Sequence, residues 1–467
     1  MNALDRIRTA LGPLGTVEDP QAVAPYLADR RGRGAGAAAL VARPASTEEV
    51  AAVVRICAEA RIALVPQGGN TGLMGGGIPD GTGTQVLLNL GRMNRIRDLD
   101  PVDNSLVAEA GCVLATVQAA AEAADRQFPL SLGSEGTAQI GGLISTNAGG
   151  TMTIRHGNMR EQVLGIEAVL PDGRIWNGLR RLRKDNTGYD LKHLFIGGEG
   201  TLGIITAAVL RLQPRPRQIE TALCAIPDPA SALALLDRCR TAMGDALRAF
   251  ELMPRMGIDM ALKHVPGTAD PFSAPHPWYV LVEVASPSLV SGFRETLEGA
   301  LQAGLEADEA VDALIAESGA QRAAFWRLRE ALVEGRRKEG AGIHHDISVP
   351  TSRVPAFLDQ AGRTVETLVP GIRIVAFGHL GDGNLHYNLN APVGSDAAAF
   401  LARTSEVNRL VHDIVRSFGG SISAEHGIGV HKRDELARAK DPLELELMRR
   451  IKAALDPLGI LNPGKVL

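Results

Sequence analysis

The chain has 467 residues, of which 45% are hydrophobic and 22% charged, and its formal net charge is −4. This length is enough for two or three domains, and the composition is typical of a soluble globular protein. The slight negative charge argues against nucleic acid or an anionic membrane as partner, because both favour a basic face. The sequence contains no apolar run long enough for a transmembrane helix.

A short helix is predicted at the N-terminus, where Leu4, Ile7 and Leu11 form an apolar stripe. This stripe is not the continuous apolar run of a signal peptide, and nearby acidic residues such as Asp5 argue against a transit peptide. We therefore expect a cytoplasmic protein in which residues 1–35 form an N-terminal helical segment.

From residue 36 onward, short strands alternate with helices. Ser46 and Glu49 have the spacing of a capping box and predict the start of a helix. Prolines 214 and 216 indicate a domain boundary. Strands are predicted at 37–44, 62–69, 85–90, 105–111 and 205–213, helices at 47–60 and 113–126, and a hairpin at 165–176 with Asp172-Gly173 at its turn.

The second half begins with a new alternation of strands and helices. Strands are predicted at 220–228 and 278–286, and each is followed by a helix, the second of which ends near Gly304. This pattern indicates an α+β domain with antiparallel strands and helices on one face. The last 60 residues combine helix with a glycine-rich loop, Ser423 to Gly429.

Glycine is the compositional anomaly. The chain has 52 glycines, clustered at 68–83, 133–150, 197–203, 378–383 and 419–429. Such density is typical of backbone that turns with positive φ or approaches a ligand closely. The first three clusters predict a cradle in the first half, and the last two predict a site in the second half.

Three segments of the first half, residues 65–73, 129–150 and 185–206, carry the glycines of that cradle. Backbone N–H groups at residues without side chains can converge on an anionic group such as a pyrophosphate. No G-x-G-x-x-G follows the first strand, so a Rossmann-type NAD site is not supported.

Together the three segments resemble the FAD-binding domain of vanillyl-alcohol oxidase-type flavoenzymes, over about residues 36–214. The resemblance implies that residues 67–73 hold the pyrophosphate, that 132–150 wrap the ribityl chain and flavin, and that 200–206 run beside the isoalloxazine. The FAD-binding residues that it implies are Pro66, Gln67, Gly68, Gly69, Asn70, Thr71, Gly72, Leu73, Leu132, Gly133, Ser134, Gly136, Thr137, Ile140, Gly141, Gly142, Ser145, Asn147, Gly149, Glu199, Gly203, Ile204, Ile205 and Asn462.

Some members of this family attach FAD through a His or Cys in the first loop. In this chain Asn70 follows Gly68 and Gly69. We therefore expect FAD to be bound non-covalently.

A metal site is predicted in the second half. His379 and His386 are seven residues apart with an Asp382-Gly383 turn between them, which can bring both imidazoles to one point. Glu425 lies in the later glycine-rich loop. Two His and one carboxylate leave positions open for substrate, as in catalytic zinc sites, although the same set also suits Mn²⁺ or Fe²⁺.

The segments GHLGDGNLHYN and SAEHGIG resemble the C-terminal domain of D-2-hydroxyglutarate dehydrogenases and flavin-dependent D-lactate dehydrogenases. The resemblance implies that His379, His386 and Glu425 bind Zn²⁺, that Asn388 binds the substrate carboxylate and that His426 is the general base, in contact with substrate. In such an enzyme the metal lowers the pKa of the substrate hydroxyl, His426 removes its proton, and hydride passes to flavin N5.

The pocket for the distal end of the substrate departs from that family. Arg329 matches a carboxylate-binding arginine. Glutarate-specific members have Thr and Lys where this chain has Val333 and His344. Either the substrate tail is smaller or more apolar, as in D-lactate, or Arg336, Arg337 or Lys338 substitutes.

The sequence thus predicts an α+β fold: a two-subdomain vanillyl-alcohol oxidase-type FAD-binding domain, an α+β substrate domain with an antiparallel sheet, and a C-terminal segment. The predicted boundaries are 1–35, 36–214, 215–425 and 426–467, the last segment returning to the FAD domain.

The predicted function is FAD- and metal-dependent oxidation of a D-2-hydroxy acid to the 2-keto acid. The alternative is a non-redox FAD enzyme of the alkyl-dihydroxyacetone-phosphate synthase type. The four cysteines lack the spacing of an iron–sulfur site. Electrons are therefore expected to pass to a separate acceptor, namely an electron-transfer flavoprotein, a quinone or a cytochrome. The chain is also compatible with a homodimer.

Overall fold

The computed structural model describes residues 1–29, 31–32 and 35–467 and divides into two compact units. Unit 1 comprises Met1–Gly150, Gly157–Arg215 and Glu425–Leu467, and unit 2 comprises Thr151–His156 and Pro216–Ala424. The predicted segment 1–35 includes residues 30, 33 and 34, which lie outside the described residues. Residues 151–156 fall in unit 2, whereas the predicted FAD domain included them.

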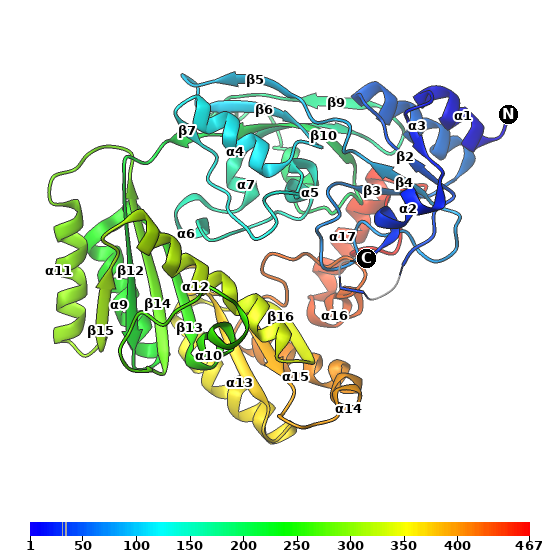
Figure 1. The fold of residues 1–467 in the computed structure, drawn as a ribbon. Helices are drawn as coiled ribbons and strands as arrows, with labels where there is room; N and C mark the ends of the chain where they lie inside the picture. The colour runs from blue at the N-terminus through cyan, green and yellow to red at the C-terminus, as the bar shows by residue number, and fades with distance from the viewer. Residues whose placement is uncertain (30, 33–34) are drawn as a thin grey trace. The chain divides into compact units, whose positions relative to one another are not determined.

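Unit 1 contains a small mixed sheet with strand order β1-β2-β4-β3, in which β2, β4 and β3 are parallel and β1 is antiparallel to β2. Strands β2, β3 and β4 lie close together near α2 and α3 in Figure 1. Helix α3 packs on this sheet through Val50, Val53 and Val54, and Ser46 caps the helix by accepting a hydrogen bond from the amide of Glu49. The predicted strands and helix here are confirmed. Bounds are α1 Ala3–Leu11, β1 Thr16–Val17, α2 Pro20–Leu27, β2 Leu40–Ala42, α3 Thr47–Ala60, β3 Leu64–Gln67 and β4 Val86–Asn89.

The second sheet of unit 1 is antiparallel, with strand order β5-β6-β10-β8-β9. Helices α4 and α5 share its buried core, through Val117 and Ile144 among others. Gly173 has φ 81° in the loop of the predicted β8–β9 hairpin. Bounds are β5 Ile96–Asp100, β6 Ser105–Glu109, α4 Leu114–Ala123, β7 Arg126–Gln127, α5 Ile140–Ser145, α7 Met159–Gln162, β8 Val163–Val169, β9 Ile175–Gly178, α8 Lys192–Phe195, β10 Ile204–Arg211 and β11 Gln213–Pro214.

The C-terminal segment of the chain is part of unit 1. It contains α16 (Arg433–Ala439) and α17 (Pro442–Leu455). Its last residues run beside β3, because the amide of Leu64 donates to the carbonyl of Ile460 and the amide of Asn462 donates to the carbonyl of Leu64. The pairing ties the end of the chain to the strand that leads into the glycine-rich loop at 68–77.

Unit 2 is built on a seven-stranded sheet with strand order β15-β12-β14-β13-β17-β18-β16, and all its strand pairs are antiparallel. The predicted antiparallel sheet is thereby confirmed. Bounds are β12 Gln218–Ile226, β13 Leu247–Pro254, β14 Trp278–Ser286, β15 Asp312–Ile315, β16 Gly342–Ser348, β17 Arg373–His379 and β18 Asn384–Asn390.

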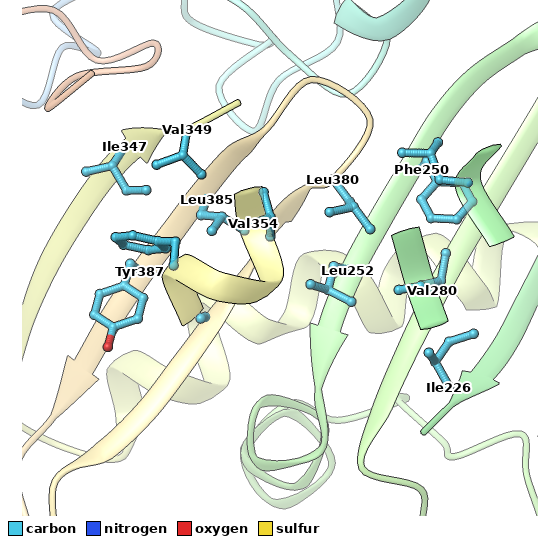
Figure 2. Close-up of a cluster of buried hydrophobic side chains, with 14 of the residues drawn as sticks. Ile226, Phe250, Leu252, Val280, Ile347, Val349, Val354, Leu380, Leu385 and Tyr387 are labelled. Carbon is cyan, nitrogen blue, oxygen red and sulfur yellow. The ribbon is translucent and has the colours of Figure 1, made fainter. Parts of the chain in front are cut away.

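Helices cover both faces of this sheet, so the prediction of helices on one face was wrong. One face shares a core with α9, α11, α13 and α15, and Figure 2 shows Val354 of α13 with Leu385 and Tyr387 of β18. The other face packs on α10 and α12. Strand β14, WYVLVEVAS, is apolar on both faces, a pattern typical of strands buried on both sides. Bounds are α6 Thr153–His156, α9 Pro229–Met243, α10 Arg255–His264, α11 Phe293–Glu306, α12 Gly319–Lys338, α13 Val354–Leu368, α14 Ala397–Ala402 and α15 Thr404–Ser417.

In the described part of the chain, the helices are all too short or too polar to cross a membrane.

Candidate active site

Unit 1 contains a pocket lined by residues from all three glycine-rich segments. The first loop follows directly from β3, and the other segments contribute α5 and the start of β10. The pocket brings together many of the residues predicted to bind FAD. These are Pro66, Gln67, Gly68, Gly69, Asn70, Thr71, Gly72, Gly141, Gly142, Ser145, Glu199, Gly203, Ile204 and Ile205.

Other predicted FAD residues are not among the described residues that line this pocket. They are Leu73, Leu132, Gly133, Ser134, Gly136, Thr137, Ile140, Asn147, Gly149 and Asn462. Conversely, the prediction missed some lining residues, although the glycine cluster at 68–83 pointed to several of them. These are Met74, Gly75, Gly76, Gly77, Ile78, Leu90, Gln139, Leu143, Thr146 and Gly200, with His426, which had been assigned to the substrate.

The glycines of the pocket serve two different purposes. A Cβ at Gly69 would lie 1.9 Å from the carbonyl oxygen of Thr137, so packing within the protein excludes a side chain there. A Cβ at Gly72 or Gly142 would meet no described atom within 4 Å. Gly72 and Gly142 therefore leave backbone open toward the pocket, as binding of a phosphate group requires. The Oε1 atom of Gln139 is also buried there without a hydrogen-bond partner among the described residues. These features fit a bound dinucleotide.

Asn70 holds the first loop in place. Its φ is 51°, in the left-handed region that Asn tolerates. Its side-chain amide donates to the carbonyls of Pro25 (3.2 Å) and Ala28 (3.0 Å), at the end of α2. The Asn70 side chain therefore ties the first loop to the end of α2. Non-covalent binding of FAD stays a prediction.

Glu199 connects the pocket to the loop that carries His426. The Glu199 carboxylate accepts hydrogen bonds from the amides of Ile428 (2.7 Å) and Gly429 (2.9 Å). Burial raises the pKa of Glu199 above its usual value, and these two amides partly oppose the shift. Asn462 donates to the carbonyl of Glu199 (2.8 Å). Glu199 and Asn462, both predicted to bind FAD, thus also fix the C-terminal loop, and His426 reaches the lining of the same pocket.

In unit 2, the β17–β18 hairpin brings the two predicted metal-binding histidines together. His379 ends β17 and pairs with Asn384, while His386 pairs with Phe377. This register places both imidazoles on one face of the sheet, with ring centroids 5.7 Å apart. Between the strands, Gly383 has φ 80°, and a Cβ there would lie 2.1 Å from the carbonyl oxygen of Val349. Only glycine fits this turn.

A buried carboxylate lies behind His379. Glu251, on β13, is the cross-strand neighbour of His379, and one of its oxygens lies 2.5 Å from His379 Nδ1. Its other oxygen accepts from Nε of Arg329 (2.8 Å), whose guanidinium lies over the ring of Phe377. Burial alone raises the pKa of Glu251, but the charges and hydrogen bonds of His379 and Arg329 outweigh it and lower the pKa to about 2. Glu251 is therefore a carboxylate at neutral pH.

Further polar side chains continue along the same face of the sheet. Asn388 is buried, and its amide donates to the carbonyls of His386 (2.8 Å) and Val375 (3.2 Å). Asp346 is the cross-strand neighbour of His386 and a candidate metal ligand that the sequence analysis missed. The two residues before it in β16 are both His, which hid the alternation of polar and apolar positions.

The predicted distal pocket is partly assembled. His344 pairs across the strands with Asn388, and its ring nitrogens lie 2.8 and 3.1 Å from Nη1 of Arg336. Arg336 is buried on the sheet-facing side of α12, as is Arg329, two turns earlier. Val333 is 48% exposed, although it lies four residues after Arg329 and three before Arg336, a spacing that puts it on the same side of α12 as the two arginines.

Comparisons with known proteins agree with these features. Residues 38–178 match the family described as FAD binding domain, and residues 215–466 match FAD linked oxidases, C-terminal domain. Curated relatives include mitochondrial D-2-hydroxyglutarate dehydrogenase of Arabidopsis thaliana, 39% identical over 98% of this chain and 80% of its own length. The D-2-hydroxyglutarate dehydrogenase of Stutzerimonas stutzeri (strain A1501) is 36% identical over 99% of this chain and 98% of its own length.

Solved structures with the same fold include p-cresol methylhydroxylase with substrate bound (TM-score 0.76, 17% identity, 99% of this chain and 96% of that chain). Alkyldihydroxyacetonephosphate synthase matches with a TM-score of 0.75 and 18% identity, over 99% of this chain and 84% of that one. The fold is of the vanillyl-alcohol oxidase type, and the matched families and relatives define an FAD-binding oxidoreductase. Within that class, the chain belongs to the FAD-linked oxidase family that includes the D-2-hydroxyglutarate dehydrogenases.

Proposed function

We propose that this enzyme oxidises a D-2-hydroxy acid to the 2-keto acid with the help of a divalent metal, zinc in the first instance. The observation that carries the proposal is the pair of histidines, His379 and His386, on one sheet face with ring centroids 5.7 Å apart. Two neighbouring imidazoles backed by a buried carboxylate are a common arrangement of zinc ligands.

His379, His386 and Glu425 are the proposed metal ligands. Glu425 is included because it directly follows Ala424 in the chain. The amide of Ala424 donates to the carbonyl of Asp346 at 3.4 Å, and Asp346 is the cross-strand neighbour of His386. Bound zinc supplies Lewis acidity that lowers the pKa of a substrate hydroxyl. Asp346 is the competing carboxylate ligand.

The substrate's reacting end is assigned to Asn388 and His426. The Asn388 amide is held beside His386 by two backbone carbonyls, so its position is fixed before substrate binds. His426 lines the FAD pocket and can accept the proton of the C2 hydroxyl. Bound FAD supplies the acceptor for the hydride that leaves C2.

The distal end of the substrate is assigned to Arg336 with His344. Arg336 carries a permanent charge and lies against His344, the position where glutarate-specific relatives have Lys. A guanidinium there can bind a second carboxylate. We therefore propose D-2-hydroxyglutarate as the first substrate to test, which agrees with the names of the relatives.

A separate electron acceptor and a cytoplasmic location are also proposed. All four cysteines are buried, and burial raises the pKa of Cys57 and Cys239 to about 12, which suits buried apolar positions better than cluster ligands.

Anaerobic mixing of the purified enzyme with D-2-hydroxyglutarate, D-lactate and D-2-hydroxybutyrate tests the proposal. The flavin absorption band is expected to bleach with D-2-hydroxyglutarate, and faster than with D-lactate. A flavin that stays oxidised with every D-2-hydroxy acid contradicts the proposal and favours the non-redox alternative. Faster bleaching by the shorter acids contradicts only the role of Arg336.

A further inference from the structure

The strongest unexplained feature of unit 2 is Glu251, which is fully buried and yet touches both halves of the proposed chemistry. One oxygen contacts Nδ1 of His379, a proposed metal ligand, and the other contacts Nε of Arg329, which the sequence resemblance matches to a carboxylate-binding arginine.

The contact with His379 decides which nitrogen of the ring is available. A carboxylate accepts hydrogen bonds and cannot donate them, so the proton of a neutral His379 is held at Nδ1. The lone pair is then on Nε2, on the opposite side of the ring from Glu251. Partners of this kind fix the orientation and tautomer of metal-binding histidines.

The contact with Arg329 fixes a second group. Arg329 is buried on α12, its guanidinium lies 4.9 Å from the centroid of the Phe377 ring, and Glu251 is its one hydrogen-bond partner among the described residues. Because Nε is the donor, the two Nη groups are left for a planar carboxylate. The same Glu251 also neutralises the buried guanidinium.

We infer that Glu251 is a positioning residue shared by the metal and the substrate: it orients His379 toward the metal and Arg329 toward the substrate carboxylate. This inference rests on the proposed function. Because both contacts use one carboxylate, loss of that carboxylate should weaken metal binding and substrate binding together.

The test is the Glu251→Gln variant, compared with wild type as full-length FAD-loaded enzyme. A Gln side chain can accept from only one of the two donors and presents N–H groups to the other. The Kd for Zn²⁺ alone, measured by chelator competition, is expected to rise on the order of 10- to 100-fold. The KM for D-2-hydroxyglutarate is expected to rise about tenfold, and FAD content to stay unchanged.

Glu283→Gln is the matched control. Glu283 lies on β14, on the same face of the sheet, and is buried against Arg248, Thr221 and Trp326. It has no contact with His379 or Arg329, so this variant should lose stability comparably while its Kd for Zn²⁺ stays within about twofold of wild type.

A second variant, Glu251→Asp, keeps the negative charge but has a side chain one methylene shorter. It replaces Glu251→Gln in the test if that variant does not fold. Its Kd for Zn²⁺ and its KM for D-2-hydroxyglutarate are expected to rise less than those of Glu251→Gln. If wild type binds Zn²⁺ and the Glu251 variants bind it equally well, Glu251 has no positioning role although the proposed function stands. A wild type that binds no Zn²⁺ contradicts the proposed metal dependence, and the inference with it.

Discussion

At the scale of single residues, His426 is the group on which the proposed chemistry depends most. It lines the flavin pocket. The amides of Ile428 and Gly429, which follow it closely in the chain, donate hydrogen bonds to Glu199 and so fix the backbone of this loop. Asn70 shows the opposite case, because its hydrogen bonds hold the glycine-rich loop and have no part in the proposed reaction.

His426→Ala is predicted to retain FAD and to lose about 10²- to 10⁴-fold in kcat, the range for removal of a general base. FAD content from the absorption spectrum and steady-state turnover with a dye acceptor measure the two quantities. A variant with normal kcat would remove His426 from the role of base. Loss of FAD would show instead that its place in the pocket lining matters more for the cofactor.

At the scale of elements, the loop 425–429 is kept in place by a side chain from a distant part of the sequence. Glu199 accepts the amides of Ile428 and Gly429, and a Cβ at Gly427 would lie 2.8 Å from one of its oxygens. The loop is therefore shaped by packing against Glu199 as much as by its own glycines.

Glu199→Ala is predicted to loosen this loop. Two buried amides lose their acceptor, which costs on the order of 1–3 kcal/mol for each. Hydrogen exchange of the peptide that covers 425–431 should speed up, while peptides from α3 stay as protected as in wild type. Unchanged exchange at 425–431 would mean that the loop is held by other contacts.

The sequence predicted the elements that follow a simple period and missed those that do not. Helix α3 and strands β3, β4 and β10 were found because apolar periodicity and a capping box mark them. Strands β16 and β18 were missed because one of their faces carries His, Asn and Asp at positions where a strand usually has apolar residues. Glu251 could not be predicted, since only the pairing of β13 with β17 brings it to His379.

At the scale of the whole molecule, the residues assigned to the proposed reaction belong to two compact units. Unit 1 has the flavin pocket and His426, and unit 2 has the histidine pair, Asn388 and Arg329. The chain passes from one unit to the other after residues 150, 156, 215 and 424. The last of these passages puts Glu425 in a different unit from His379 and His386.

The most direct test of the proposed function is whether reduction of the flavin by substrate depends on the metal. Enzyme stripped with a chelator should retain FAD, because the flavin pocket lies in unit 1 and includes neither histidine of the pair. On anaerobic mixing with D-2-hydroxyglutarate, its flavin should bleach on the order of 100-fold more slowly than that of untreated enzyme, and stoichiometric Zn²⁺ should restore the rate. Metal-free enzyme with full FAD content that bleaches at the untreated rate would contradict the account.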